Sequence, residues 1–250
     1  MRLAFQHLRD TKNIGDRWCS PFDYFDWGDA TVRDIRTPGT PYEVGIYGGG
    51  KIFGGLPKYK GVTIKPGTPQ IAWGVSTVQN FPISVRYAKA RRIMTHVGTR
   101  DYGDKRFPWV PCVSCMATGF NDPASPVHDV VFYFHGGKTN KQGISIPNHI
   151  PSMSNNAGSL DKALAFIASG RTVVSNSYHG TYWALLMRRR VICVPFSKKF
   201  SAYRLPPAYA TPRNWLDKLD QGLAQPDMLA MCRDRTLEFK AKVDQIITAG

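Results

Sequence analysis

Short apolar runs alternate along the whole chain with polar, glycine-containing turns and with longer segments of helical character. Apolar, β-branched runs bounded by turn residues indicate strands, and longer amphipathic segments indicate helices. The pattern predicts strands at residues 3–8, 42–47, 70–75, 96–101, 127–135, 172–174 and 191–196. It predicts helices at residues 84–94, 159–169, 178–187, 215–223 and 228–247. Strands and helices that alternate in this way are typical of an α/β protein.

A break in this alternation falls at residues 119–126, GFNDPASP, where glycine, proline, asparagine and aspartate cluster. Such residues favour turns and linkers. Because strands alternate with helices on both sides of this segment, we expect two Rossmann-like domains that face a central cleft. The predicted domains are residues 1–120 and residues 127–250.

The segment at residues 171–200 has the most informative pattern, in which a strand, a polar turn, a helix, a basic turn and a second strand follow one another. Three successive polar residues, Ser175, Asn176 and Ser177, can cap the helix at its N-terminus. Where a parallel strand leads into a helix, the first backbone N–H groups of the helix can bind an anion. His179 falls in the first helical turn. We therefore predict an anion-binding site beside His179.

Two loops in the first half of the chain also follow predicted strands, and they could also contribute to a ligand-binding site. The first spans residues 10–16 and ends with Asp16, which could act as a general base. The second begins with Gly48-Gly49-Gly50-Lys51, where glycines would let the backbone approach a ligand closely. This loop has neither the spacing of a dinucleotide fingerprint nor that of a phosphate-binding P-loop.

The net charge of the chain and its distribution indicate which partners the protein could bind. The net charge is +15, from 33 Lys and Arg against 18 Asp and Glu. Acids are absent from residues 44–100 and again from residues 162–216, and each of these runs contains nine basic residues. Basic surfaces of this kind suit anionic substrates, anionic lipid headgroups or nucleic acid.

The five cysteines and the lack of long apolar segments favour a cytoplasmic protein, which could also touch the inner face of the membrane peripherally. The N-terminal residues are too polar for a signal peptide. Cys112 and Cys115 form the only closely spaced pair. One such pair is weak evidence for zinc, so no metal site is predicted.

Four motifs occur in order along the chain: Asn13-Ile14-Gly15-Asp16, GGGKIFGG from residue 48, Gly98-Thr99-Arg100-Asp101, and VSNSYHG at residues 174–180. Together they resemble the polysaccharide pyruvyl transferase family. The resemblance covers most of the chain and is strongest at residues 163–196. Ser177 occupies the position at which some members carry an arginine two residues before the motif histidine.

This resemblance implies a fold like that of GT-B glycosyltransferases. It also implies transfer of a pyruvyl group from phosphoenolpyruvate to a sugar of a surface polysaccharide or its lipid-linked precursor. Phosphoenolpyruvate is then a co-substrate, and no further cofactor is expected. The partners would be phosphoenolpyruvate or another anionic donor, and a saccharide or lipid-linked saccharide acceptor.

The formation of a ketal from an enol phosphate needs a proton donor, a base and cations. We assign these roles to the candidate residues as hypotheses. His179 would donate a proton or contact phosphate, and Asp16 in the N-terminal, acceptor-side domain would be the base. The C-terminal domain would hold the donor. The expected donor-binding residues are Ser177, Tyr178, Gly180, Arg100, Arg171, Lys198, Lys199 and His135. The expected acceptor-side loops contain Asn13, Gly15, Gly48, Gly49, Gly50 and Lys51.

Two other functions remain open from the sequence. A glycosyltransferase of similar fold would bind the diphosphate of a nucleotide sugar at the same helix N-terminus. A basic, non-enzymatic module would bind nucleic acid or an anionic membrane. Nucleic acid is the less favoured partner because no recognition motif of a known type is present. Contact with an anionic membrane is compatible with an enzyme that uses a lipid-linked acceptor.

Overall fold

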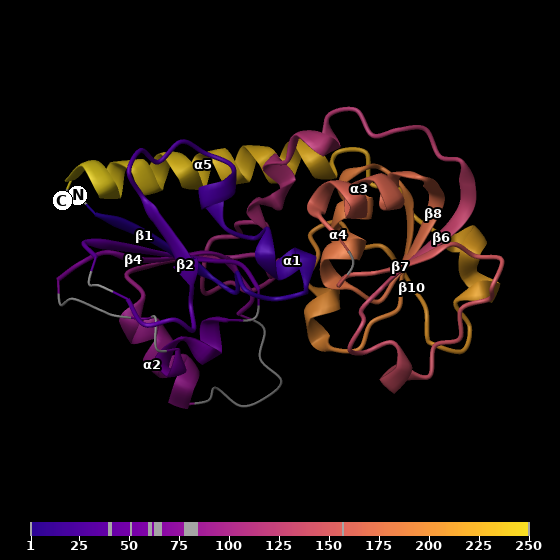
Figure 1. Cartoon of the computed structure of the whole chain (residues 1–250), viewed down its shortest axis with the longest axis horizontal. Coiled ribbons are helices and arrows are strands. Elements are labelled where there is room, and N and C mark those ends of the chain that lie inside the picture. Colours follow the sequence, from indigo (N-terminus) through magenta and orange to yellow (C-terminus); the bar gives the residue numbers. More distant parts are fainter. Residues whose placement is uncertain are drawn as a thin grey trace. The chain divides into compact units, whose positions relative to one another are not determined.

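The computed structural model describes residues 2–39, 42–50, 52–59, 62, 67–77, 85–156 and 158–249, and it contains two five-stranded parallel sheets with helices (Figure 1). The chain divides into two compact units. Unit 1 contains Met1–Thr11, Asp16–Met116 and Cys232–Gly250. Unit 2 contains Lys12–Gly15 and Ala117–Met231.

The sheet of unit 1 has the strand order β2-β1-β3-β4-β5. All its pairings are parallel, and Phe5 on the first strand lies opposite Ile46 on the third. Both faces of the central strands are buried, which is why their sequences are mostly apolar and do not alternate between apolar and polar residues. The strands are β1 (Leu3–His7), β2 (Thr31–Asp34), β3 (Val44–Gly48), β4 (Gln70–Val75) and β5 (His96–Thr99).

Helices cover both faces of this sheet, and Figure 1 shows α2 (Val85–Ile93) and α5 (Met228–Ala249) on opposite sides of it. On one face, Tyr87 of α2 packs with Tyr47 and with Phe53 of the 3₁₀ helix η2 (Phe53–Lys58). On the other face, Phe239 and Val243 of α5 pack with the core strands. The connecting segments contain α1 (Ile14–Arg17) and the 3₁₀ helices η1 (Pro21–Asp23), η3 (Val113–Met116) and η4 (Thr118–Phe120).

The sheet of unit 2 has the strand order β10-β9-β8-β6-β7 and is also parallel throughout. On one face, α3 (Leu160–Ala168) packs beside α4 (Tyr178–Leu186). On the other face, Trp215 packs against Phe132. The strands are β6 (His128–Phe134), β7 (Ser152–Ser154), β8 (Gly170–Ser175), β9 (Arg190–Cys193) and β10 (Ala208–Tyr209). The 3₁₀ helices are η5 (Asn140–Gln142), η6 (Lys198–Ser201) and η7 (Leu216–Gln221).

Both sheets share one topology. Numbered within its own unit, each sheet has the strand order 2-1-3-4-5. In such doubly wound sheets, the chain leaves the first and third strands toward opposite faces, and ligands bind where their carboxyl ends meet. This position falls after β1 and β3 in unit 1, and after β6 and β8 in unit 2. The loops after β1, β3, β6 and β8 carry part of the predicted site residues, and they follow the strands at which doubly wound sheets bind ligands.

The predicted α/β class is confirmed, and each predicted strand is present within a few residues. The short edge strands β2, β7 and β10 were not predicted. The two compact units differ from the predicted domains at three places, because residues 232–250 belong to unit 1, whereas residues 12–15 and 117–120 belong to unit 2. The physical reason for the first is that Phe239 and Val243 are buried in the core of unit 1 with Phe5.

Candidate functional site

The carboxyl ends of β6 and β8 in unit 2 are held together by Asn176. Tyr133 and Ser175 are register partners, so His135 and Asn176 follow at the same sheet edge. The Asn176 Oδ1 atom accepts the His135 backbone N–H at 2.8 Å, and its Nδ2 donates to Gln142 at 2.7 Å. Asn176 is fully buried. The turn after β6 is therefore fixed directly to the residue that precedes α4.

The N-terminus of α4 is packed tightly against β6. Ser177 caps the helix, since its Oγ accepts the Gly180 N–H at 3.4 Å. A Cβ atom on Gly180 would lie 2.3 Å from Tyr133 Cδ1 and 2.7 Å from Ser175 Oγ. Close packing between helix and strand therefore explains this glycine, which we had expected among the donor-binding residues. Ser177 and Tyr178 follow β8 and lie at the carboxyl edge of the sheet.

His179 is positioned by its packing against Gly15 within unit 2. Its side chain is 5% exposed, and a Cβ atom on Gly15 would lie only 2.0 Å from His179 Nδ1. The rings of Tyr178 and Trp183 lie 5.5 Å from the His179 ring, centroid to centroid. Gly15, in the Asn13–Asp16 motif, thus leaves the space that His179 of the VSNSYHG motif fills.

The Asn13–Gly15 segment is tied to the same sheet edge by Asn155, which follows β7. Asn155 Nδ2 donates to Asn13 Oδ1 at 3.0 Å, and the Asn155 carbonyl accepts the Ile14 N–H at 2.9 Å. Asn155 Oδ1 also accepts the Gly136 N–H at 2.9 Å. The sequence analysis missed Asn155, because β7 is too short to mark the polar residue after it.

Cations and aromatic rings gather after β9 and β6. Lys199 Nζ lies 4.9 Å from the centroid of the Phe196 ring and 6.0 Å from that of Tyr178. Lys138 Nζ lies 6.0 Å from Phe196, and the His135 ring lies 5.4 Å from it. Burial, with a further contribution from Lys199 and Lys138, lowers the pKa of His135. We call this group (His135, Lys138, Phe196 and Lys199) the cation–aromatic cluster. It places positive charge beside the carboxyl edge of the sheet.

Two predicted donor-binding residues of unit 2, Arg171 and Lys198, are exposed. Arg171 is near the amino end of β8, exposed, with its Nε 3.6 Å from Asp129 Oδ1. Five residues of strand, about 16 Å, separate it from Asn176 at the carboxyl end. Lys198 is exposed, whereas its neighbour Lys199 is partly buried in the cluster. Strand direction therefore puts Arg171 at the opposite edge of the sheet, and the structure does not bring it together with His179 and Ser177.

Within unit 1, the glycine loop after β3 packs against the chain near Asp16. Cβ atoms on Gly48 and Gly49 would lie 2.7 Å from the Cys19 carbonyl oxygen and 2.5 Å from Cys19 Cβ, respectively. Gly50 has a φ of 68°, and a Cβ there would lie 3.3 Å from Asp16 Oδ1. Asp16 and this loop therefore share the carboxyl edge of the first sheet, although packing against Cys19 accounts for two of the glycines. Lys51 lies outside the described residues.

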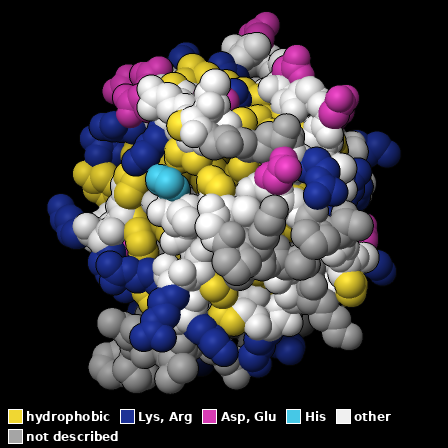
Figure 2. Space-filling model, turned by 90° about the vertical axis from the view of Figure 1, so that its left-hand side faces the viewer, with side chains coloured by type: hydrophobic (Ala, Val, Ile, Leu, Met, Phe, Trp, Pro, Cys, Tyr) yellow, Lys and Arg dark blue, Asp and Glu magenta, His cyan; other side chains and the backbone are white. Residues whose placement is uncertain are grey.

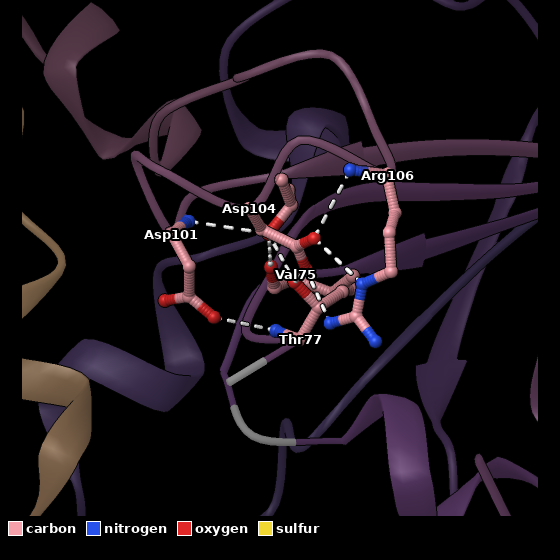
Figure 3. Close-up of polar contacts among 6 residues, drawn as sticks. Val75, Thr77, Asp101, Asp104 and Arg106 are labelled. Carbon is pink, nitrogen blue, oxygen red and sulfur yellow. Dashed lines mark hydrogen bonds and ion pairs between the residues drawn. The ribbon is translucent and has the colours of Figure 1, made fainter. Parts of the chain in front are cut away.

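Arg100 and Asp101 follow β5 and lie in a buried polar network of unit 1, whose acidic part is drawn in Figure 3. Asp101 Oδ2 accepts the Thr77 N–H at 2.6 Å and the Ser76 hydroxyl at 2.9 Å. The Thr77 hydroxyl donates to Asp104 Oδ2 at 2.5 Å. These bonds join the carboxyl ends of β4 and β5 and fix the backbone on either side of Arg100, which is 3% exposed.

The exposed charge is spread rather than gathered at one point. On the face drawn in Figure 2, Lys and Arg side chains lie at many separate positions, while Asp and Glu lie mainly along its upper part. Helix α2 carries no acid, and its Lys89, Arg91 and Arg92 are exposed. The excess of basic residues therefore produces a broadly positive surface, with the cation–aromatic cluster as one local concentration in unit 2.

No family model, curated protein or solved structure matches the chain at a significant level. Among the described residues, no helix is long and apolar enough to cross a membrane. The same residues include no group of three or more His, Cys, Asp or Glu side chains that could hold a metal ion.

Proposed function

We propose that the protein is a transferase of the polysaccharide pyruvyl transferase type, which moves a pyruvyl group from phosphoenolpyruvate to a sugar. The observation that carries this proposal is the set of groups at the carboxyl edge of unit 2. His179, the capped N-terminus of α4, and Lys199 with Lys138 lie around the ligand position of a doubly wound sheet. An imidazole beside a helix N-terminus and two ammonium groups suit a donor that carries phosphate and carboxylate.

The reaction needs a proton donor, a base and positive charge. The methylene carbon of phosphoenolpyruvate takes up one proton and becomes a methyl group. Two sugar hydroxyls form C–O bonds to the adjacent carbon, the bond to phosphate breaks, and the two hydroxyl protons leave. One of these two protons replaces the proton that the methylene carbon has taken up, and the other leaves with the phosphate. In the proposal, His179 supplies the first proton, and Lys199 and the helix N-terminus stabilise the phosphate.

The acceptor would bind at the carboxyl edge of unit 1. Asp16, beside Gly50, is the proposed base for the sugar hydroxyls. The proposal includes a GT-B-like arrangement, with the acceptor on unit 1 and the donor on unit 2. A lipid-linked acceptor would bring the basic surface of the protein near anionic headgroups at the inner face of the membrane.

A thermal-shift screen distinguishes this function from its alternatives. A ligand that binds only the folded state raises the unfolding temperature in a concentration-dependent way. We expect phosphoenolpyruvate to raise it and nucleotide sugars to leave it unchanged. A rise with nucleotide sugars alone would indicate a glycosyltransferase. No response to any small ligand, together with steeply salt-dependent nucleic-acid binding, would indicate a non-enzymatic module.

A further inference from the structure

A pocket lies in unit 1 at the carboxyl end of β1, and none of the residues that line it has a role in the proposed reaction. Its volume is about 150 Å³. That is room for about five water molecules at their liquid volume of about 30 Å³ each. Its walls are formed by His7, Arg9, Arg17, Trp18 and Asp23. The pocket is therefore large enough for one small ionic group.

His7 is the buried polar group of this pocket, and its hydrogen bonding fixes its tautomer. The side chain is 1% exposed, and Nε2 lies 3.0 Å from the Arg17 carbonyl oxygen. Because a carbonyl oxygen can only accept, Nε2 must carry a proton. Nδ1 is buried and has no hydrogen-bond partner among the described residues. Burial lowers the pKa of His7 to about 4, so at neutral pH the Nδ1 atom holds a lone pair.

The two arginines provide the positive charge. Arg9 and Arg17 are both exposed, and neither guanidinium forms an ion pair or hydrogen bond with another described residue. The one acid in the lining is Asp23, whose pKa burial raises to about 6, against an opposing effect of Arg9. At neutral pH the two guanidinium groups therefore outnumber the single carboxylate in the lining.

Two further acids act on His7 from neighbouring segments. Asp10 and Asp34 both favour its protonated form electrostatically, while Arg9 opposes it. The Asp34 carboxylate is already occupied by Arg36 and by the backbone N–H groups of Arg9 and Asp10. Among the described residues that line the pocket, His7 Nδ1 is therefore the only buried side-chain nitrogen or oxygen atom without a hydrogen-bond partner.

We propose that this pocket binds a small oxyanion, a phosphate or a carboxylate group, between Arg9 and Arg17, with uptake of a proton at His7 Nδ1. The guanidinium groups match either oxyanion through paired N–H donors. An anion beside His7 favours the imidazolium, whose Nδ1–H then donates to the anion. Trp18 provides an apolar wall for the remainder of the ligand. This inference does not depend on the proposed transferase activity.

Calorimetric titration of the full chain tests the pocket, with sulfate as the tetrahedral probe and acetate as the carboxylate probe. Sulfate stays a dianion over the relevant pH range, so its pH dependence reports the protein. We expect Arg17→Gln to weaken binding of the preferred anion about tenfold or more. The exposed Arg213 of unit 2 provides the matched control, and Arg213→Gln should leave the affinity unchanged.

The direction of the pH effect follows from proton uptake. Affinity for sulfate should increase as pH falls through about 6, where Asp23 loses its charge, and further as His7 is protonated. In the unmodified protein, NMR of labelled histidine should show a higher His7 pKa with the anion than without it. Preference for sulfate assigns the pocket to phosphates, and preference for acetate assigns it to carboxylates.

Three results would overturn the proposal. The first is that neither anion binds at millimolar concentration. The second is binding that Arg17→Gln does not weaken, and the third is a His7 pKa that the anion does not change. Lys199→Gln serves as a further control, because loss of sulfate binding in that variant alone would place the anion in unit 2.

Discussion

At the scale of single residues, the contact between Gly15 and His179 relates two motifs that lie far apart in the chain. The sequence identified both residues as candidates, because each falls in a motif after a strand. It could not predict their contact, since nothing in the spacing indicates that the Asn13–Gly15 segment packs on unit 2. Asn155, which holds that segment, could not be predicted for the same reason.

Replacement of Gly15 by alanine tests this contact. The added methyl group would lie 2.0 Å from His179 Nδ1, so the ring or the loop must move. We expect Gly15→Ala to lower the free energy of unfolding by about 1–3 kcal/mol, measured by urea denaturation. Gly137→Ala is the matched control, because a Cβ there meets His135 at an ordinary 3.8 Å. Equal stability of the two variants would argue against tight packing around His179.

At the scale of elements, the sequence predicted the buried strands well, because strands covered on both faces are continuously apolar. The edge strands β2, β7 and β10 have four, three and two residues, and each is partly exposed. Such strands carry little apolar signal, and long-range pairing decides whether they form. Strand direction was equally decisive, since it places Arg171 at the edge opposite to His179.

Asp34, at the end of the edge strand β2, forms hydrogen bonds with the backbone that follows β1. Its carboxylate, 3% exposed, accepts the N–H groups of Arg9 and Asp10 at 2.9 and 2.8 Å, and it pairs with Arg36 at 2.7 Å. Burial by itself would raise the pKa of Asp34, but the Arg36 and backbone hydrogen bonds outweigh it and lower the pKa. The stabilisation is therefore present above the unfolded pKa of about 3.9 and is lost as pH falls below it.

This linkage predicts the effect of Asp34→Asn. At neutral pH the variant should lose about 1–3 kcal/mol of unfolding free energy, because buried donors lose a charged acceptor. Its stability should also fall less steeply than that of the wild type between about pH 5 and about pH 3. Urea denaturation at several pH values measures both effects. The exposed Asp29 gives the control variant Asp29→Asn, and an identical acid response of Asp34→Asn and the wild type would contradict the linkage.

At the scale of the whole molecule, the two sheets repeat one topology although no repeat is visible in the sequence. The order 2-1-3-4-5 brings the loops after the first and third strands of each sheet together. Sequence order predicted which loops carry polar residues, but only strand order shows which loops share an edge. This is why His135, Ser177 and His179 come together in unit 2, while Asp16 and Gly50 come together in unit 1.

The proposed function requires the carboxyl edge of unit 2 to bind an anionic donor through Lys199. Calorimetric titration of phosphoenolpyruvate into the wild type, Lys199→Gln and Lys198→Gln tests it most directly, since the two lysines are neighbours and Lys199 is the one in the cation–aromatic cluster. We expect phosphoenolpyruvate to bind the wild type, to bind Lys199→Gln about tenfold more weakly, and to bind Lys198→Gln with unchanged affinity. No binding to the wild type, or equal affinity in all three proteins, would contradict it.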